Sequence, residues 1–316
     1  MFDAVDNGGK MKKIIFTGLD NSGKSSIIYA LQEGVARIVT LRPTTFVERS
    51  SFRFLDYTIA QHDLGGQKKY RINYLKNPGK FFLGTDVCIY VVDIQDLGRY
   101  EDAISYFYDL LTEFENLEIK PFIYVFFHKA ERLLIEENVE DRRGMDLLLG
   151  RFADINHERF ELGFKITTIF DVWTITSSFS DIMLKLHPRG ELIDKTVKEL
   201  ANNLNAEAVI LFDKNILILA QYFPDKSLKI LAQYIAPSLF KIESVLDRFE
   251  DVKKDKMKLE MEDYEVGFMD FKDSKPRIYL VAIARPGKLP RFNDLDRLTT
   301  ALPDLFLSLG INFEKK

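Results

Sequence analysis

The chain has 316 residues and a formal net charge of −4; 46% of the residues are hydrophobic and 13% are aromatic. This length suits two domains, and the apolar content excludes an intrinsically disordered chain. The small acidic balance argues against nucleic acid as the main partner, because that role needs a strongly basic face. The lone cysteine, Cys88, lies in an apolar run, so we expect a buried strand residue without a disulfide.

Neither end of the chain shows a targeting or lipidation signal. Residues 1–4 lack a basic-then-apolar pattern, and residue 2 is Phe2 rather than glycine. Residues 312–316 contain no prenylation cysteine, and no apolar run reaches the length of a membrane-spanning helix. We therefore expect a cytoplasmic protein without a membrane anchor of its own, which partners would have to recruit to any membrane.

Strand and helix patterns alternate through the first 187 residues. This alternation predicts an α/β fold with a doubly wound, mostly parallel sheet and right-handed crossovers. The continuous apolar runs are typical of strands buried on both faces. The expected strands include residues 14–16, 87–94, 122–127 and 166–173, and the expected helices are 25–33, 99–115, 139–153 and 178–186.

The segment 187–190, which contains Pro188 and Gly190, interrupts this alternation. We place a domain boundary there, which gives domains at residues 1–187 and 190–316. The second part predicts an α+β domain with an antiparallel sheet and shows no catalytic constellation. Its expected elements are a helix at 192–204, strands at 208–212 and 216–220, a helix at 227–249 broken at Pro237, strands at 258–271 and 277–284, and a helix at 292–309.

The strongest chemical signal is the segment GLDNSGKS at residues 18–25, between an expected strand and an expected helix. Its glycines let the backbone curl so that N–H groups face a phosphate. Lys24 then reaches the β- and γ-phosphates, the Ser25 hydroxyl binds Mg²⁺, and the helix adds its positive end. The expected phosphate-binding residues are Gly18, Asn21, Ser22, Gly23, Lys24, Ser25 and Ser26.

A second motif, DLGGQ at residues 63–67, complements the first. Asp63 is positioned to hold Mg²⁺ through water, the amide of Gly66 to sense the γ-phosphate, and Gln67 to orient the attacking water. Between the two motifs, Thr44 can close over Mg²⁺ and the γ-phosphate, with Thr45 as the rival candidate. The predicted metal ligands are Ser25, Thr44 and Asp63, and the predicted catalytic residues are Gln67, Lys24 and Thr44.

Two later segments are candidates for contacts to the base. His128, Lys129 and Glu131 follow an expected strand; the lysine stem can cover a purine ring, and the carboxylate can accept two hydrogen bonds from a guanine edge. An ordinary charged loop is the alternative. Ser177 and Ser178 follow the next expected strand, where they offer backbone N–H groups to the base or cap a helix.

Taken in order, the segments GLDNSGKSS, PTTF, DLGGQ, HKAE and TSS resemble the five signature motifs of Ras-superfamily GTPases. The first and third are similar to the Arf style, and the whole chain resembles the Rag/Gtr GTPases. That likeness includes a His-Lys-x-acid base motif and a second part similar to the family's roadblock-like dimerisation domain. Two positions differ: Glu131 stands where the family usually has Asp, and His62 where it usually has Trp.

The resemblance implies a molecular switch that binds GTP or GDP with Mg²⁺ and hydrolyses GTP slowly. It also implies dimerisation through residues 190–316, with an identical or a different partner. An activating protein, an exchange factor or a roadblock scaffold are the regulatory partners to expect. Arg42 is a candidate for an arginine finger within the chain. Asp20 and Asn21 stand where many Ras-type loops have glycine, which would crowd an arginine supplied by a partner.

Two other classes of function remain open. The first is a scaffold that uses a bound nucleotide only for stability, and the intact Lys24, Ser25, Asp63 and Gln67 argue against it. The second is a P-loop ATPase or kinase. That class needs an acceptor pocket or an arginine-rich lid, and the sequence indicates neither.

Overall fold

The computed structural model describes residues 11–33, 47–54, 57–131, 139–155, 159–187, 190–246, 256–271, 274–275, 277–290 and 312–313. The chain divides into two compact units, residues 1–178 and 179–316. This division falls within a helix, earlier in the chain than the segment 187–190, so the domain boundary read from the sequence stays a prediction. Within the described part of the chain, no helix is both long enough and apolar enough to cross a membrane.

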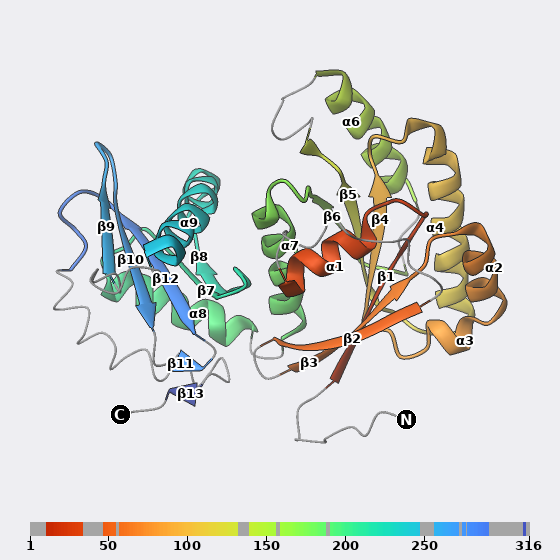
Figure 1. Cartoon of the computed structure of the whole chain (residues 1–316), viewed down its shortest axis with the longest axis horizontal. Coiled ribbons are helices and arrows are strands. Elements are labelled where there is room, and N and C mark those ends of the chain that lie inside the picture. The colour runs from red at the N-terminus through yellow and green to blue at the C-terminus, as the bar shows by residue number, and fades with distance from the viewer. Residues whose placement is uncertain are drawn as a thin grey trace. The chain divides into compact units, whose positions relative to one another are not determined.

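The first unit is built on a six-stranded sheet of order β2-β3-β1-β4-β5-β6 (Figure 1). Every neighbouring pair is parallel except β2 with β3. The doubly wound, mostly parallel sheet is therefore confirmed. The strands are β1 Met11–Gly18, β2 Val47–Phe54, β3 Tyr57–Leu64, β4 Val87–Asp93, β5 Phe122–His128 and β6 Leu162–Ile166.

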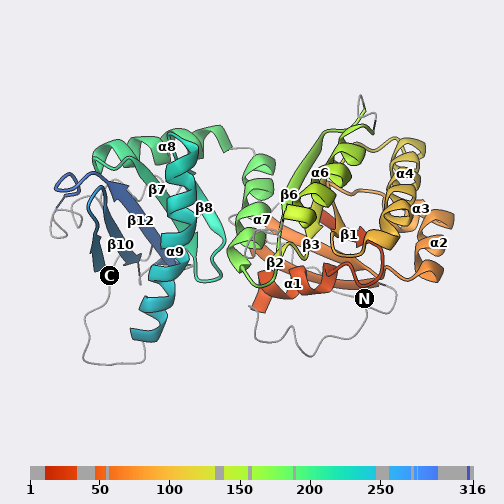
Figure 2. The same cartoon turned by 90° about the horizontal axis from the view of Figure 1, so that it is seen from above.

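Helices cover both faces of this sheet, with α1 and α4 on opposite sides (Figures 1 and 2). Covering both faces explains why β4 is buried along nearly its whole length. The helices are α1 Lys24–Glu33, α2 Lys68–Lys76, α3 Pro78–Phe81, α4 Tyr100–Asn116, α6 Val139–Ala153 and α7 Val172–Leu186, with a short 3₁₀ helix η2 at Leu97–Arg99.

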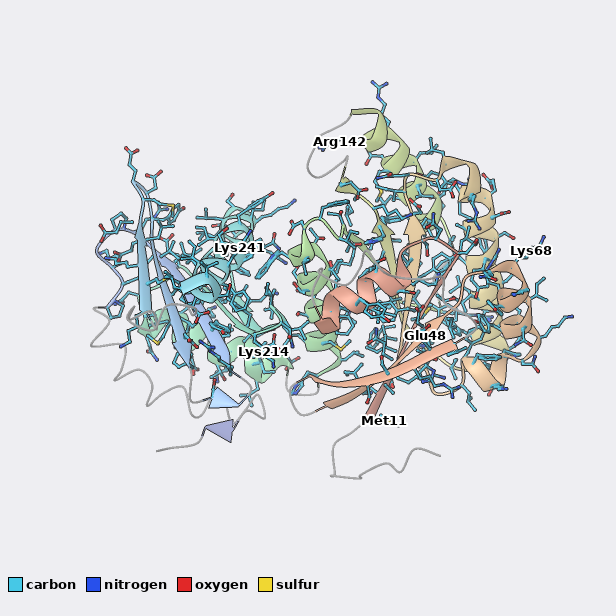
Figure 3. The ribbon with its side chains drawn as sticks, viewed as in Figure 1. Met11, Glu48, Lys68, Arg142, Lys214 and Lys241 are labelled. Carbon is cyan, nitrogen blue, oxygen red and sulfur yellow. The ribbon has the colours of Figure 1, made fainter. Side chains whose placement is uncertain are left out.

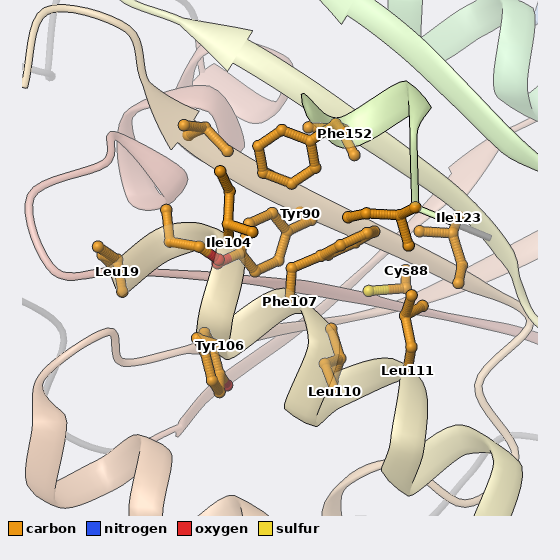
Figure 4. Packing of buried hydrophobic residues seen from close by; sticks show 14 of the residues in the cluster. Leu19, Cys88, Tyr90, Ile104, Tyr106, Phe107, Leu110, Leu111, Ile123 and Phe152 are labelled. Carbon is orange, nitrogen blue, oxygen red and sulfur yellow. The ribbon is translucent and has the colours of Figure 1, made fainter. Parts of the chain in front are cut away.

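A cluster of aromatic and aliphatic side chains fills the space between this sheet and the helices α4 and α6 (Figure 4). The ring of Tyr90 lies 4.8 Å from that of Phe107, centroid to centroid, and its hydroxyl donates to the carbonyl of Ala103 at 2.6 Å. That bond satisfies the polar end of a fully buried tyrosine. Cys88 is completely buried in the same cluster, as predicted. This packing fixes β4, whose end borders the phosphate loop.

The second unit contains a five-stranded antiparallel sheet of order β8-β7-β12-β10-β9. Helices α8 and α9 lie on opposite faces of it, so β7 and β12 are buried on both sides (Figures 1 and 2). The predicted α+β architecture is confirmed. Its elements are α8 Gly190–Asn203, β7 Ala208–Asp213, β8 Ile218–Tyr222, α9 Lys226–Leu246, β9 Lys256–Glu260, β10 Glu265–Phe271 and β12 Ile278–Ala284, with the short pair β11 Ser274–Lys275 and β13 Asn312–Phe313.

Three expected elements are wrong. Pro237 lies inside the continuous helix α9 and does not break it. The strand expected at 258–271 is two strands, because the N–H of Met261 donates to the carbonyl of Tyr264 and closes a turn between β9 and β10. The strand expected at 166–173 ends at Ile166, and the helix begins at Val172. The helix expected at 292–309 lies outside the described residues.

Candidate functional site

The phosphate loop joins the end of β1 to the start of α1, in the strand–loop–helix order that the sequence predicts. Gly18 and Gly23 have φ angles of 138° and 93°, and Asn21 has a φ of 61°. A Cβ on Gly18 would lie 2.3 Å from the carbonyl oxygen of Val91, so that position has no room for a side chain. Left-handed conformations of this kind suit glycine and asparagine, and they turn successive N–H groups toward one point.

Lys24 is buried at the start of α1, only 5% exposed. Its ammonium group donates to the carbonyl of Leu19 at 2.6 Å and lies 3.3 Å from the hydroxyl of Ser22. Burial lowers the pKa of Lys24 to about 8, although the nearby charges of Asp63 and Asp20 oppose that shift. Among the described residues, the acceptors of this desolvated cation all belong to its own loop, so Lys24 is well prepared to bind an anion.

The side chains of Ser25 and Asp63 are in contact although they lie 38 positions apart in the chain. Asp63 lies next to Phe16 in the register of β3 against β1, close to where the phosphate loop begins. The Ser25 hydroxyl donates to the Asp63 carboxylate at 2.5 Å. Hydroxyl and carboxylate oxygens are hard ligands that suit Mg²⁺, which takes few protein ligands and completes its shell with water and phosphate oxygens. The residues present therefore fit this ion, and no described group of three acidic, His or Cys side chains offers a rival metal site.

The second predicted motif packs directly on the phosphate loop. A Cβ on Gly66 would lie 2.2 Å from the backbone nitrogen of Asp20, so only glycine allows this approach. Gln67 follows as the residue before α2, partly exposed. Arg71, which the sequence analysis missed, donates to the Gly66 carbonyl at 2.9 Å and stacks 5.0 Å from the centre of the Tyr106 ring. This bond spans five positions around the start of α2, and no motif of the sequence pointed to it.

His128 ends β5 and joins two parts of the site. Its Nδ1 lies 3.0 Å from the hydroxyl of Thr167, and its ring lies so close to Gly23 that a Cβ there would be 2.4 Å from the His128 Cδ2. Burial lowers the pKa of His128 to about 3, with the charge of Lys129 as a smaller cause. The neutral imidazole therefore packs between the phosphate loop and the segment after β6.

Lys129 and Glu131 face the same end of the sheet as His128. The Lys129 ammonium lies 2.6 Å from the Asp93 carboxylate, and its backbone has a φ of 62°. The two oxygens of Glu131 accept hydrogen bonds from the Gln95 amide at 2.6 Å and the Thr168 hydroxyl at 2.9 Å. The structure thus brings the predicted base motif to the edge that carries the phosphate loop, and it adds Gln95 and Thr168 as partners of Glu131.

Ser177 and Ser178 do not follow a strand. Both are buried in the second turn of α7, with exposures of 8% and 6%. The segment after β6 instead contains Thr167 and Thr168, which bond to His128 and Glu131 as described above. The β-branched run from Ile166 to Ile169 is typical of a strand, which is why the expected strand extends too far along the chain. The N–H of Trp173 donates to the side chain of Asp171, a cap that starts α7.

The predicted loop residues Gly18, Asn21, Ser22, Gly23, Lys24, Ser25 and Ser26 lie together, with Asp63 and Gly66 against them. Thr44, its rival Thr45 and Arg42 lie outside the described residues. The loop after β1, the acidic end of β3 and the His-Lys-x-acid segment after β5 meet at the carboxyl ends of parallel strands, where such sheets bind nucleotides. This combination defines a P-loop nucleotide-binding protein of the G-protein class.

The comparison with known families sharpens this class. The Gtr1/RagA G protein conserved region matches residues 13–253. The chain therefore belongs to the Gtr1/RagA family of Ras-superfamily GTPases.

Individual relatives are more distant. GTP-binding protein gtr2 of Schizosaccharomyces pombe is 28% identical over 212 residues, which is 65% of this chain and 64% of that protein. ADP-ribosylation factor 3 of Arabidopsis thaliana is 35% identical over 115 residues, 36% of this chain and 59% of that protein. The chain thus spans just under two thirds of the length of these curated relatives. The Arl6 BBS3 small GTPase of Trypanosoma brucei, solved with GppNp, matches 55% of this chain and 96% of its own at 17% identity and a TM-score of 0.44.

Proposed function

We propose that this protein is a Rag-like molecular switch that binds GTP or GDP with Mg²⁺ and hydrolyses GTP slowly. The observation that carries the proposal is the 2.5 Å contact between Ser25 and Asp63 beside the buried Lys24. A helix-start hydroxyl, a strand-end carboxylate and a desolvated lysine meet in G proteins because one phosphate chain and one metal ion need all three.

Each residue of the nucleotide site has its own role in this proposal. Lys24 supplies positive charge to the phosphates, and the backbone N–H groups of the loop with Ser22 to Ser26 complete the cradle. Mg²⁺, when bound, neutralises phosphate charge, and Ser25, Asp63 and Thr44 are the residues that would hold it. Gln67 orients the attacking water.

Release of the γ-phosphate would free Gly66 and Thr44, and the resulting loop movement is the output of the switch.

Guanine recognition is assigned to the segment after β5. Glu131 accepts hydrogen bonds from the base, and the Lys129 stem covers its face. Because Gln95 and Thr168 hold the Glu131 carboxylate, the extra methylene relative to aspartate has a defined position. The same two bonds leave acceptor capacity on each oxygen for a base.

Nucleotide analysis of the purified protein tests this function. Guanine nucleotide should co-purify, and guanine nucleotide should bind far more tightly than ATP. Gln67→Leu should slow hydrolysis without weakening binding. A protein that binds no guanine nucleotide, or binds ATP equally well, contradicts the switch, and a Gln67→Leu variant with unchanged turnover favours the scaffold instead.

Dimerisation belongs to the same proposal and concerns residues 190–316. This part offers an antiparallel sheet and a helix, α9, on which Ile230 and Tyr234 are 47% and 69% exposed. The partner is a second copy or a related chain, and partners of this kind would recruit the cytoplasmic protein to a membrane. Light scattering of the full chain, alone and with a candidate partner, tests it; a strict monomer under both conditions contradicts it.

A further inference from the structure

An ion pair ties the phosphate loop to the 3₁₀ helix η2. Asp20 occupies the third position of the loop, and Arg99 is the last residue of η2. The Arg99 guanidinium donates to the Asp20 carboxylate at 2.5 Å and to the Asp20 backbone carbonyl at 3.2 Å. Both side chains are partly buried, with exposures of 31% and 46%. This two-point contact captures the loop through side chain and backbone together.

Asp20 poses an electrostatic problem for a loop that binds phosphates. A carboxylate on the loop repels the nucleotide, and the repulsion grows with each further charge on the phosphate chain. The charges of Asp20 and Arg99 are both felt at Lys24, where Asp20 raises the pKa and Arg99 lowers it. The pair therefore lies within electrostatic reach of the phosphate-binding ammonium.

Arg99 is held in place for this contact by its own surroundings. The Arg99 N–H donates to the carbonyl of Asp96 at 3.0 Å and closes the turn of η2. The next residue, Tyr100, donates from its hydroxyl to the carbonyl of Ile94 at 2.5 Å, which anchors the start of α4. Burial raises the pKa of Asp20, but the hydrogen bond and charge of Arg99 lower it by more. The net pKa lies below its usual value, so the carboxylate stays ionised. The loop therefore carries this negative charge at neutral pH.

We propose that Arg99 is a positioning residue that neutralises Asp20 and thereby lets the phosphate loop accept a nucleoside triphosphate. Arg99 acts through Asp20 and not on the nucleotide itself. Its loss leaves an uncompensated carboxylate on the loop, which weakens binding of a triphosphate more than that of a diphosphate. This inference deepens the proposed function and rests on it.

Affinity ratios test the inference. Dissociation constants for GDP and for a non-hydrolysable GTP analogue are measured with wild type, Arg99→Ala, Asp20→Ala and the double variant. Arg99→Ala should lower the affinity for the analogue about 3- to 10-fold more than that for GDP, as expected for one uncompensated charge in a partly screened site. The double variant should restore the wild-type ratio, because no charge is left to compensate. Arg99→Lys keeps the positive charge and should therefore bring the ratio of the two affinities part of the way back to the wild-type value.

A matched control separates this role from the loss of any surface arginine. Arg151 of α6 pairs with the exposed Glu101 of α4, and among the described residues neither side chain bonds to the phosphate loop, so Arg151→Ala should leave both affinities unchanged. If Arg99→Ala weakens both nucleotides equally, or if Asp20→Ala does not rescue it, Arg99 is only structural and the inference is wrong. Should Arg99→Ala fold poorly, Arg99→Gln removes the charge and keeps hydrogen-bond donors; an unchanged ratio in that variant has the same meaning. A wild-type protein that binds no guanine nucleotide would instead refute the proposed function.

Discussion

The two units of the molecule place their buried charges differently. In the first unit, Lys24 and Asp63 lie at the ends of elements, where the carboxyl edge of a parallel sheet meets loops. In the second unit, the ionic groups join one regular element to another: Arg277 binds Asp270 of β10 and Glu243 of α9, the latter at 2.7 Å. The Asp270 and Glu243 side chains are 0% and 2% exposed.

This difference separates buried charges that stabilise the fold from buried charges that are available to bind a ligand. Asp270 and Glu243 are neutralised by Arg277 beside them, whose guanidinium also lies 5.4 Å from the centre of the Tyr279 ring. The lysine of the first unit has backbone carbonyls as its close acceptors, and burial lowers its pKa. A charge that its neighbours neutralise holds a fold together, whereas a desolvated lysine whose hydrogen bonds go to neutral oxygens can still bind an anion.

The largest effect should come from the second unit. Arg277→Ala leaves two buried carboxylates without their cation, so the free energy of unfolding should fall by about 4 kcal/mol. Guanine nucleotide affinity should not change. Urea unfolding followed by circular dichroism measures the first quantity. The control is Arg285→Ala. The Arg285 side chain is 53% exposed and pairs with Glu207, so its loss should lower the free energy of unfolding by less than about 0.5 kcal/mol. Equal effects of the two variants would contradict the comparison.

Lys24→Met should show the opposite pattern, a loss of nucleotide affinity without a loss of stability. Removing a charge-assisted contact to phosphate should weaken GDP binding by about 100-fold. The ligand-free protein should keep its stability, because the methionine no longer buries a charge. Fluorescent-nucleotide titration and thermal unfolding measure the two quantities. Lys241, exposed on α9 (Figure 3), supplies the control variant Lys241→Met, which should change neither. A destabilised Lys24→Met variant with intact GDP affinity would show that the lysine is structural.

His128 allows a test by pH. Its pKa is about 3 in the folded protein and about 6.5 when unfolded, so the unfolded chain binds more protons between these values. The free energy of unfolding should therefore fall as the pH is lowered from about 6.5 toward 3, by about 2 kcal/mol at pH 5 from this residue. His128→Asn should lack this contribution. Denaturant unfolding of both proteins at pH 7 and pH 5 measures it, and parallel profiles would show that His128 is not buried as a neutral group.

The smallest effect concerns base selectivity. Glu131→Ala removes the acceptor assigned to guanine, so the preference for GDP over ADP should fall by about 10-fold. Phosphate contacts are unaffected, and ADP binding should therefore stay the same. Competition binding with both nucleotides measures the ratio. Asp109, exposed on α4, provides the control Asp109→Ala. An unchanged preference in the Glu131 variant would assign base recognition elsewhere.

Much of the fold could be read from the sequence where its signal is local. The apolar run that forms β4 and the amphipathic pattern of α4 need no knowledge of distant residues, and both occur as expected. The failures fall where tertiary contacts override local preference. The helix α9 continues through Pro237. The strand β6 ends at Ile166 because the N–H and carbonyl of Thr168 bond to the hydroxyl of Thr174 and turn the chain into α7.

The spacing of Gly18, Gly23, Lys24 and Ser25 is sufficient by itself to predict a phosphate loop, because that geometry is made by eight consecutive residues. The acidic end of β3 and the His-Lys-x-acid segment are likewise legible as motifs. Only the tertiary structure brings Arg99 to Asp20, Arg71 to Gly66 and Gln95 to Glu131. Partners such as Arg99 and Asp20, 79 positions apart, are chosen by the packing of strands and helices and carry no local pattern.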